Sequence, residues 1–334
     1  MLDLVLYRLK TLIEKLKSVG MSPSDWLVEL CGRLIAQRSK TMPKGMRAKV
    51  SANARLVPLL DQNIDISQFT ITRHEFEQNP AKLKQIISRY GLCLIEQYFD
   101  QSVAHGAAKE LKMFFSGDEF NSAFDSFASG SKENDDFLWQ VDQSWSADYQ
   151  VLAHHSKPVI SIRSRQKDTD DVGMIDIFGL DKFTKLQKPN ISSIYKGLFE
   201  GSLSESVSQI SGYSRQQTNL YLNEGVLRTR GPHIDNNQNP FKVFLYLTDC
   251  VEEKNGPYCY LPRSVTDRRW MTHERLKNAL LGLPSTEVSS FPRDNMVKLF
   301  AKAGTVVVSN QSGIHCGWPQ SSNGTRLMLV SSYY

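Results

Sequence analysis

Long apolar runs are missing from this chain of 334 residues. No stretch approaches the roughly 20 consecutive apolar residues that a membrane-spanning helix needs. The apolar N-terminal stretch contains charged residues at five positions between Asp3 and Lys15, which is not the pattern of a signal peptide. We therefore expect a protein with no transmembrane segment and no secretory leader.

Cysteine is also scarce. The five cysteines, an odd number without close pairing, do not make a disulfide framework. Cys250, Cys259 and Cys316 do not have the spacing of a zinc site, so we interpret them as small, mostly buried residues. Unpaired thiols are typical of a reducing compartment, and we expect a cytoplasmic protein.

The positive charge of the chain is unevenly distributed. Residues 1–60 contain eleven Lys or Arg and four Asp or Glu, a net charge of +7, so the remaining residues carry −2 of the total of +5. A basic surface can bind nucleic acid, but this excess lacks an interleaved aromatic stripe. A role in nucleic-acid demethylation is therefore disfavoured.

The N-terminal segment has the apolar periodicity of helices. Apolar residues recur at helical spacing up to Gly20, and a second helix is expected to begin at Ser22-Pro23. We interpret residues 1–60 as a basic helical extension and residues 61–334 as the main domain. The extension is either a hairpin packed on that domain or a surface for a protein partner or an anionic membrane.

The rest of the chain alternates between helical and strand patterns and becomes β-rich toward its C-terminus. Residues 116–150 show no clear period. We expect helices at about 79–90, 101–115, 190–212 and 265–282, and strands at about 91–97, 159–164, 173–178, 218–223, 242–249, 258–261, 305–309 and 326–333.

Two histidines and a carboxylate stand out in the β-rich part. His233 and Asp235 are two residues apart, and residues at that spacing on a strand share one face. His315 follows in a second strand-rich stretch. Two histidines and one carboxylate form the facial triad of non-heme iron oxygenases, which leaves open positions for a chelating co-substrate and O2. The alternative is that both histidines are ordinary core or loop residues.

Other residues near the triad are candidates for ligand contacts. Arg326, eleven residues after His315, can hold the far carboxylate of a co-substrate. Asn219 and Tyr221 share one strand face and are candidate co-substrate contacts, with core packing as the alternative. Arg230 and Trp318 are candidate substrate contacts, with a solvated loop arginine and plain packing as the alternatives.

Four stretches resemble the phytanoyl-CoA dioxygenase family of Fe(II)- and 2-oxoglutarate-dependent oxygenases. They are PHID, FLYLTDCVEEKNGPYCYLPRS, GTVVVSNQSGIHCGWP and TRLMLVSSY, with a fainter similarity in IISRYGLCLIEQYFD. The resemblance runs from about residue 80 to the end. It departs at Arg263 and Val265, where the family often has glycine and histidine, and at Gly317, where a hydroxyl residue often contacts 2-oxoglutarate.

The resemblance implies a mainly β fold with flanking helices, namely a double-stranded β-helix (a jelly roll, cupin-like). It also implies an Fe(II)- and 2-oxoglutarate-dependent dioxygenase that uses O2, hydroxylates a small molecule and releases succinate and CO2. The presence of the carboxylate of Asp235 argues against a halogenase, which needs that position vacant. The alternative is a non-catalytic cupin-like metal-binding or regulatory protein.

Overall fold

The computed structural model describes the protein from residue 64 onward, with gaps. The expected N-terminal helices, the proposed boundary at residue 60 and nearly all of the segment 116–150 lie outside the described residues. The described residues are 64–115, 149–153, 159–163, 170–171, 174–180, 188–235, 240–266, 270–271, 274, 278 and 283–334.

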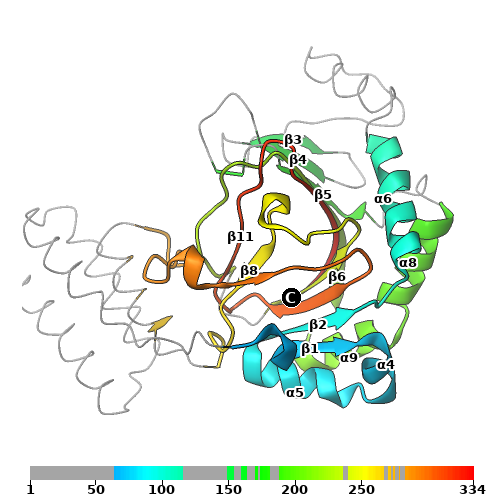
Figure 1. Cartoon of the computed structure of the whole chain (residues 1–334), viewed down its shortest axis with the longest axis horizontal. Coiled ribbons are helices and arrows are strands. Elements are labelled where there is room, and N and C mark those ends of the chain that lie inside the picture. Colours follow the sequence, from blue (N-terminus) through cyan, green and yellow to red (C-terminus); the bar gives the residue numbers. More distant parts are fainter. Residues whose placement is uncertain are drawn as a thin grey trace, which may run out of the picture.

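Two β-sheets form the centre of the described structure (Figure 1). The large sheet has the order β1 (Thr70–Thr72), β2 (Leu92–Glu96), β10 (Val306–Asn310), β7 (Phe241–Tyr246), β12 (Thr325–Tyr333), β6 (Arg215–Glu224), β5 (Met174–Phe178), β4 (Val159–Arg163) and β3 (Tyr149–Ala153). The small sheet has the order β11 (His315–Gly317), β8 (Tyr258–Tyr260) and β9 (Val297–Leu299).

The chain alternates between these sheets in the manner of a jelly roll. From β6 in the large sheet it passes through a bridge at His233 beside β11, returns to β7, and continues to β8 and β9 in the small sheet. It then enters β10, β11 and β12, which lie in the large, small and large sheet in turn. The expected mainly β jelly roll with flanking helices is confirmed.

Helices cover the outer face of the large sheet (Figure 1). Leu83 and Ile87 of one helix and Leu220 and Leu329 of the sheet belong to one buried apolar cluster, because apolar side chains recur at helical spacing on one side and at every second strand position on the other. The helices are α4 (Arg73–Gln78), α5 (Ala81–Tyr90), α6 (Gln101–Phe115), α8 (Pro189–Phe199) and α9 (Ser202–Ser211). Short 3-10 turns are η1 (Ile66–Phe69), η4 (Glu253–Asn255) and η5 (Arg293–Asn295).

The inner faces of the two sheets pack on each other. Phe244, Met328 and Val330 of the large sheet share a buried cluster with Tyr258 and Leu299 of the small sheet. Phe244, Tyr258 and Met328 of this cluster also line a cavity between the sheets. None of the described helices is long and apolar enough to cross a membrane.

Most expected elements are present within a few residues of their predicted bounds. The single helix expected at 190–212 is two helices, because Glu200 and Gly201 interrupt it and Gly201 N-caps α9. The helical segment expected at about 265–282 is described only at scattered positions, with helical residues at 270, 271, 274 and 278. Cys250, Cys259 and Cys316 are buried free thiols, as expected.

Candidate metal centre

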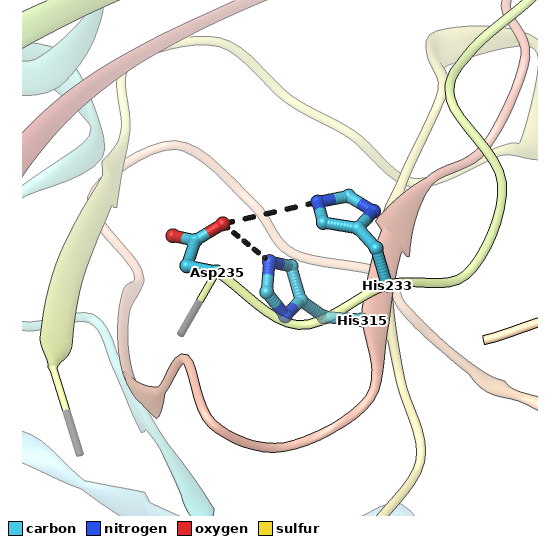
Figure 2. A group of neighbouring side chains, drawn as sticks. All are labelled: His233, Asp235 and His315. Atoms are coloured by element: carbon cyan, nitrogen blue, oxygen red, sulfur yellow. Dashed lines mark ion pairs between the residues drawn. The ribbon is translucent and has the colours of Figure 1, made fainter. Parts of the chain in front are cut away.

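His233, Asp235 and His315 converge on one point (Figure 2). One ligand atom from each residue lies within 4.8 Å of the other two. Asp235 Oδ1 is 3.9 Å from His233 Nε2 and 3.5 Å from His315 Nε2. Donors that bind one metal at about 2.1 Å lie about 3.0–3.4 Å apart, so small side-chain rotations would bring these three atoms onto one ion.

Backbone pairing between two distant segments creates this convergence. His233 N donates to His315 O at 3.0 Å, and His315 N donates to His233 O at 2.9 Å. The prediction that His233 and Asp235 lie on a strand is wrong in detail: His233 forms isolated bridges and Asp235 lies in a bend. Asp235 N donates to Gln311 O at 3.0 Å, which holds the bend next to the end of β10.

The tautomer of each histidine is set by a backbone carbonyl. His233 Nδ1 lies 2.8 Å from Gly231 O, and His315 Nδ1 lies 2.9 Å from Gly313 O. A carbonyl oxygen only accepts, so each Nδ1 carries the hydrogen and each Nε2 presents its lone pair to the other triad members. This is the arrangement of metal-binding histidines, whose other nitrogen is usually held by a hydrogen bond.

A glycine is required beside the second histidine. A Cβ placed on Gly313 would lie 1.9 Å from the hydroxyl oxygen of Tyr260. That hydroxyl donates to Asn310 O at 3.0 Å, across the turn that leads from β10 to β11. Gly313 therefore allows the turn to approach β8 closely enough for its carbonyl to orient His315.

The charges of the triad suit a metal. Burial, together with the nearby His315 and Arg230, lowers the pKa of His233 to about 2, so this imidazole is neutral at pH 7. Burial alone would raise the pKa of Asp235, but Lys242 and His315 outweigh it and hold that pKa well below its usual range. A neutral imidazole and an ionised carboxylate are the forms that bind a divalent cation.

Lys242 is a further charged neighbour of the triad. Its Nζ lies 2.7 Å from Asp235 Oδ2, the oxygen that is not directed at the histidines. Burial would lower the pKa of Lys242, but Tyr221 and Asp235 outweigh it and raise that pKa. The lysine is therefore charged and forms an ion pair with a triad member.

A cavity of about 190 Å³ opens beside the triad. Its walls come from both sheets and from the loop before His233. They combine cations, carboxylates, amides and apolar side chains. The lining residues are Asp171, Met174, Tyr221, Asn223, Thr229, Arg230, His233, Asp235, Lys242, Phe244, Tyr258, Gln311, His315, Cys316, Gly317, Arg326 and Met328.

Buried polar atoms in the cavity wall lack a partner among the described residues. They are Arg326 Nε, Asn223 Oδ1 and Gln311 Oε1. Arg326 is only 6% exposed, and one of its terminal nitrogens donates to Gly256 O. Asn223 is its direct neighbour on β6. Buried polar groups without partners are costly, so their grouping around a cavity indicates a polar ligand.

Thr229 is adjacent to Gly317. A Cβ on Gly317 would lie 3.6–3.8 Å from Thr229 side-chain carbons and 3.9 Å from Arg326 Nη2. The Thr229 hydroxyl donates to Gly317 O at 2.7 Å. A hydroxyl residue therefore does lie beside position 317, but it comes from the loop before His233, which no spacing in the sequence reveals.

Of the other four predicted site residues, two line the cavity and two do not. Tyr221 lines the cavity, whereas Asn219 is not among the lining residues and its Oδ1 accepts from Gly179 N at 3.4 Å. Arg230 lines the cavity, but its guanidinium is paired with Glu287 at 2.6 Å. Trp318 also lies outside the lining, with the ammonium of Lys298 3.6 Å from its ring centre.

The chain resembles solved structures at low identity. No protein-family model and no curated protein matches it. SnoK, a non-heme alpha ketoglutarate dependent carbocyclase from nogalamycin biosynthesis, is 15% identical with a TM-score of 0.44, covering 75% of this chain and 82% of SnoK. HygX from Streptomyces hygroscopicus, crystallised with nickel and 2-oxoglutarate, is 13% identical with a TM-score of 0.40. The match covers 75% of this chain and 85% of HygX.

A prolyl-4-hydroxylase from Pseudomonas putida is 11% identical with a TM-score of 0.39, covering 76% of this chain and 97% of the hydroxylase. These neighbours differ in the reactions for which they are named, and at these identities the likeness concerns the fold.

Proposed function

We propose that the protein is an Fe(II)- and 2-oxoglutarate-dependent dioxygenase of the phytanoyl-CoA dioxygenase type that hydroxylates a small molecule. The observation that carries this proposal is the convergence of His233, Asp235 and His315 beside a polar cavity. Two imidazoles and one carboxylate with open positions are the ligand set of non-heme Fe(II) oxygenases. Fe(II), when bound, supplies the activation of O2.

Three of the protein's own side chains would hold the metal. His233 and His315 offer Nε2 lone pairs because their Nδ1–H groups donate to Gly231 and Gly313. Asp235 adds one negative charge through Oδ1, the oxygen nearest to both imidazoles. With these three residues as its ligands, a bound metal would remain accessible from the cavity for co-substrate and O2.

Arg326 is our proposed anchor for 2-oxoglutarate. Its buried Nε lacks a partner, which a carboxylate of the co-substrate would supply. The side chain lies next to Gly317, two residues beyond His315, so a ligand held there can also reach the metal. Asn223, Thr229 and Tyr221 line the same cavity and would complete the contacts.

Asp235 and the cavity also bear on the substrate. A carboxylate at this position occupies the site that a halide would need, which favours hydroxylation or a related oxidation. The lining mixes cations and apolar groups, which suits a small molecule with polar substituents. Arg230 remains a proposed substrate contact, since it lines the cavity while paired with Glu287.

Two further predictions accompany this proposal. We expect the protein in the cytoplasm, because the four described cysteines are free thiols. We also keep residues 61–334 as the dioxygenase domain and residues 1–60 as a basic helical extension, which is either packed on that domain or a surface for a protein partner or a membrane.

The direct test is titration followed by turnover. Anaerobic protein loaded with Fe(II) should bind 2-oxoglutarate in a calorimeter, and admission of O2 should yield succinate. His315→Ala should remove both responses, whereas His105→Ala, a change at a half-exposed histidine on α6, should leave them unchanged. Metal binding without metal-dependent binding of 2-oxoglutarate would contradict the dioxygenase and favour a non-catalytic metal-binding protein.

A further inference from the structure

Asp235 uses its two oxygens for different partners. Oδ1 faces His233 and His315, while Oδ2 lies 2.7 Å from Lys242 Nζ. Among the described residues, Lys242 is the one cation within ion-pair distance of Oδ2. The side chains of Asp235 and Lys242 are 28% and 22% exposed, so water screens this pair only in part.

The two members of the pair differ in how firmly their backbones are held. Lys242 lies in β7, between Ser309 of β10 and Ser332 of β12, in the middle of the large sheet. Asp235 lies in a bend outside the regular strands, with Gln311 O accepting its backbone N–H. The strand residue therefore provides a fixed point to which the carboxylate of the bend is attached.

We propose that Lys242 is a positioning residue for the metal ligand Asp235. It holds Oδ2, so that the carboxylate presents Oδ1 alone to the metal, and it compensates the carboxylate charge in the metal-free protein. This inference rests on the metal site proposed above and assigns the role of one residue beside that site.

A charge argument gives the sign of the effect. In the metal-free protein, Lys242 is the cation nearest to the outer oxygen of a largely buried carboxylate, and removing one partner of such a pair leaves the other charge uncompensated. In the metal-loaded protein, the bound cation also compensates Asp235. Loss of the lysine charge should therefore destabilise the metal-free protein more than the loaded protein.

The test compares thermal unfolding of metal-free and Mn(II)-loaded protein, so it requires no catalytic turnover. For Lys242→Met, the Tm of the metal-free protein should fall by about 2 °C, and the rise on adding Mn(II) should exceed that of the wild type by a similar amount. By linkage, the Kd for Mn(II) should fall about tenfold. Lys242→Arg keeps the charge and should restore the wild-type rise.

Lys298 provides a matched control. Its side chain is 21% exposed and pairs with Glu253, away from the cavity lining. Lys298→Met should lower the Tm equally in both states. If Lys242→Met does not fold, Lys242→Gln, which keeps a hydrogen-bond donor without the charge, is measured in the same way.

The outcomes separate two failures. An equal loss of stability in both states would show that Lys242 does not act through Asp235, and a smaller rise with Mn(II) would contradict charge compensation as its role. A wild-type protein that Mn(II) does not stabilise would overturn the metal site itself, and the role of Lys242 with it.

Discussion

The two faces of β12 have different roles although they belong to the same nine residues. On the outer face, Leu327 and Leu329 are almost fully buried in the apolar cluster beneath the helices. On the inner face, Arg326 and Met328 line the cavity. Neighbouring residues thus serve stability and ligand binding, because successive side chains of a strand point to opposite faces.

The contrast extends across the sheet. Leu329 is aligned with Leu220 of β6 and Leu245 of β7, a row of leucines on the outer face. On the inner face, Arg326 is aligned with Asn223, and both carry buried polar atoms without partners. A sheet covered by helices on one face can tolerate buried polar atoms without partners on its other face when a bound ligand supplies their hydrogen bonds.

The largest effect is expected on the inner side, at the triad. Asp235→Ala should weaken Fe(II) or Mn(II) binding by at least about 1,000-fold, roughly 4 kcal/mol, because a metal loses its only anionic ligand among the triad residues. Calorimetric titration measures the affinity, and circular dichroism should show a folded protein. Asp294→Ala, an exposed carboxylate on η5, is the control; wild-type affinity in Asp235→Ala would refute the assignment.

A change on the outer face of β12 should affect stability and leave metal binding nearly intact. Leu329→Ala should lower the free energy of unfolding by about 3 kcal/mol, because it leaves a cavity in a fully buried apolar cluster. The affinity for Mn(II) should stay within about twofold of the wild type. Urea unfolding and metal titration of the same sample test this separation. A parallel loss of metal affinity would mean that the two faces are coupled.

Arg326→Ala sharpens the comparison within the inner face. The Kd for 2-oxoglutarate should rise by at least about tenfold, because the co-substrate carboxylate loses its charged partner, while Fe(II) binding should change little. Arg326→Lys should recover only part of the affinity, since an ammonium cannot form two parallel bonds. Unchanged binding in Arg326→Ala would direct attention to Lys242 or Arg230 as the anchor.

The smallest expected effect is a dependence on pH. The pKa of His233 is about 2 in the folded protein and about 6.5 in an unfolded chain. Between these values the unfolded state binds the extra proton, so the stability that neutral His233 provides is present above pH 6.5 and is lost as the pH falls. We expect metal-free protein to lose about 1–2 kcal/mol between pH 7 and pH 5.

Urea unfolding at the two pH values measures this loss, and His233→Gln should flatten the dependence. A wild-type protein equally stable at pH 7 and pH 5 would mean that His233 is accessible to protons. Leu329→Ala, on the outer face of β12, should lower the free energy of unfolding by the same amount at pH 7 and pH 5. The pH dependence therefore distinguishes the triad from the outer face.

Periodicity predicted much of what lies on regular elements. The sequence predicts β6, β7, β10 and β12 within a few residues of their bounds, because alternating or continuous apolar patterns are local properties of a strand. The same period could have identified Asn223, which shares the face of Tyr221 two residues away. The break at Gly201 was missed because the apolar pattern continues on both sides of it.

Pairings across the chain could not be predicted in this way. Thr229 lies beside Gly317 and Arg230 pairs with Glu287, although each pair is more than fifty residues apart in sequence. Lys242 is recognisable in the sequence as a charged residue in an apolar strand, but its contact with Asp235 depends on where the hydrogen bond to Gln311 holds Asp235.

The sequence by itself determined which residue types were available: two histidines, a carboxylate and an arginine, in a β-rich region that resembles a known oxygenase family. It also determined the two-residue alternation that gives each strand an apolar and a polar face. The tertiary structure decided which of these residues meet, through the exchange of hydrogen bonds between His233 and His315 and the jelly-roll order of the strands. The physical reason is that side-chain periodicity is a local property of the backbone, whereas a metal site requires contacts that only the packing of distant segments creates.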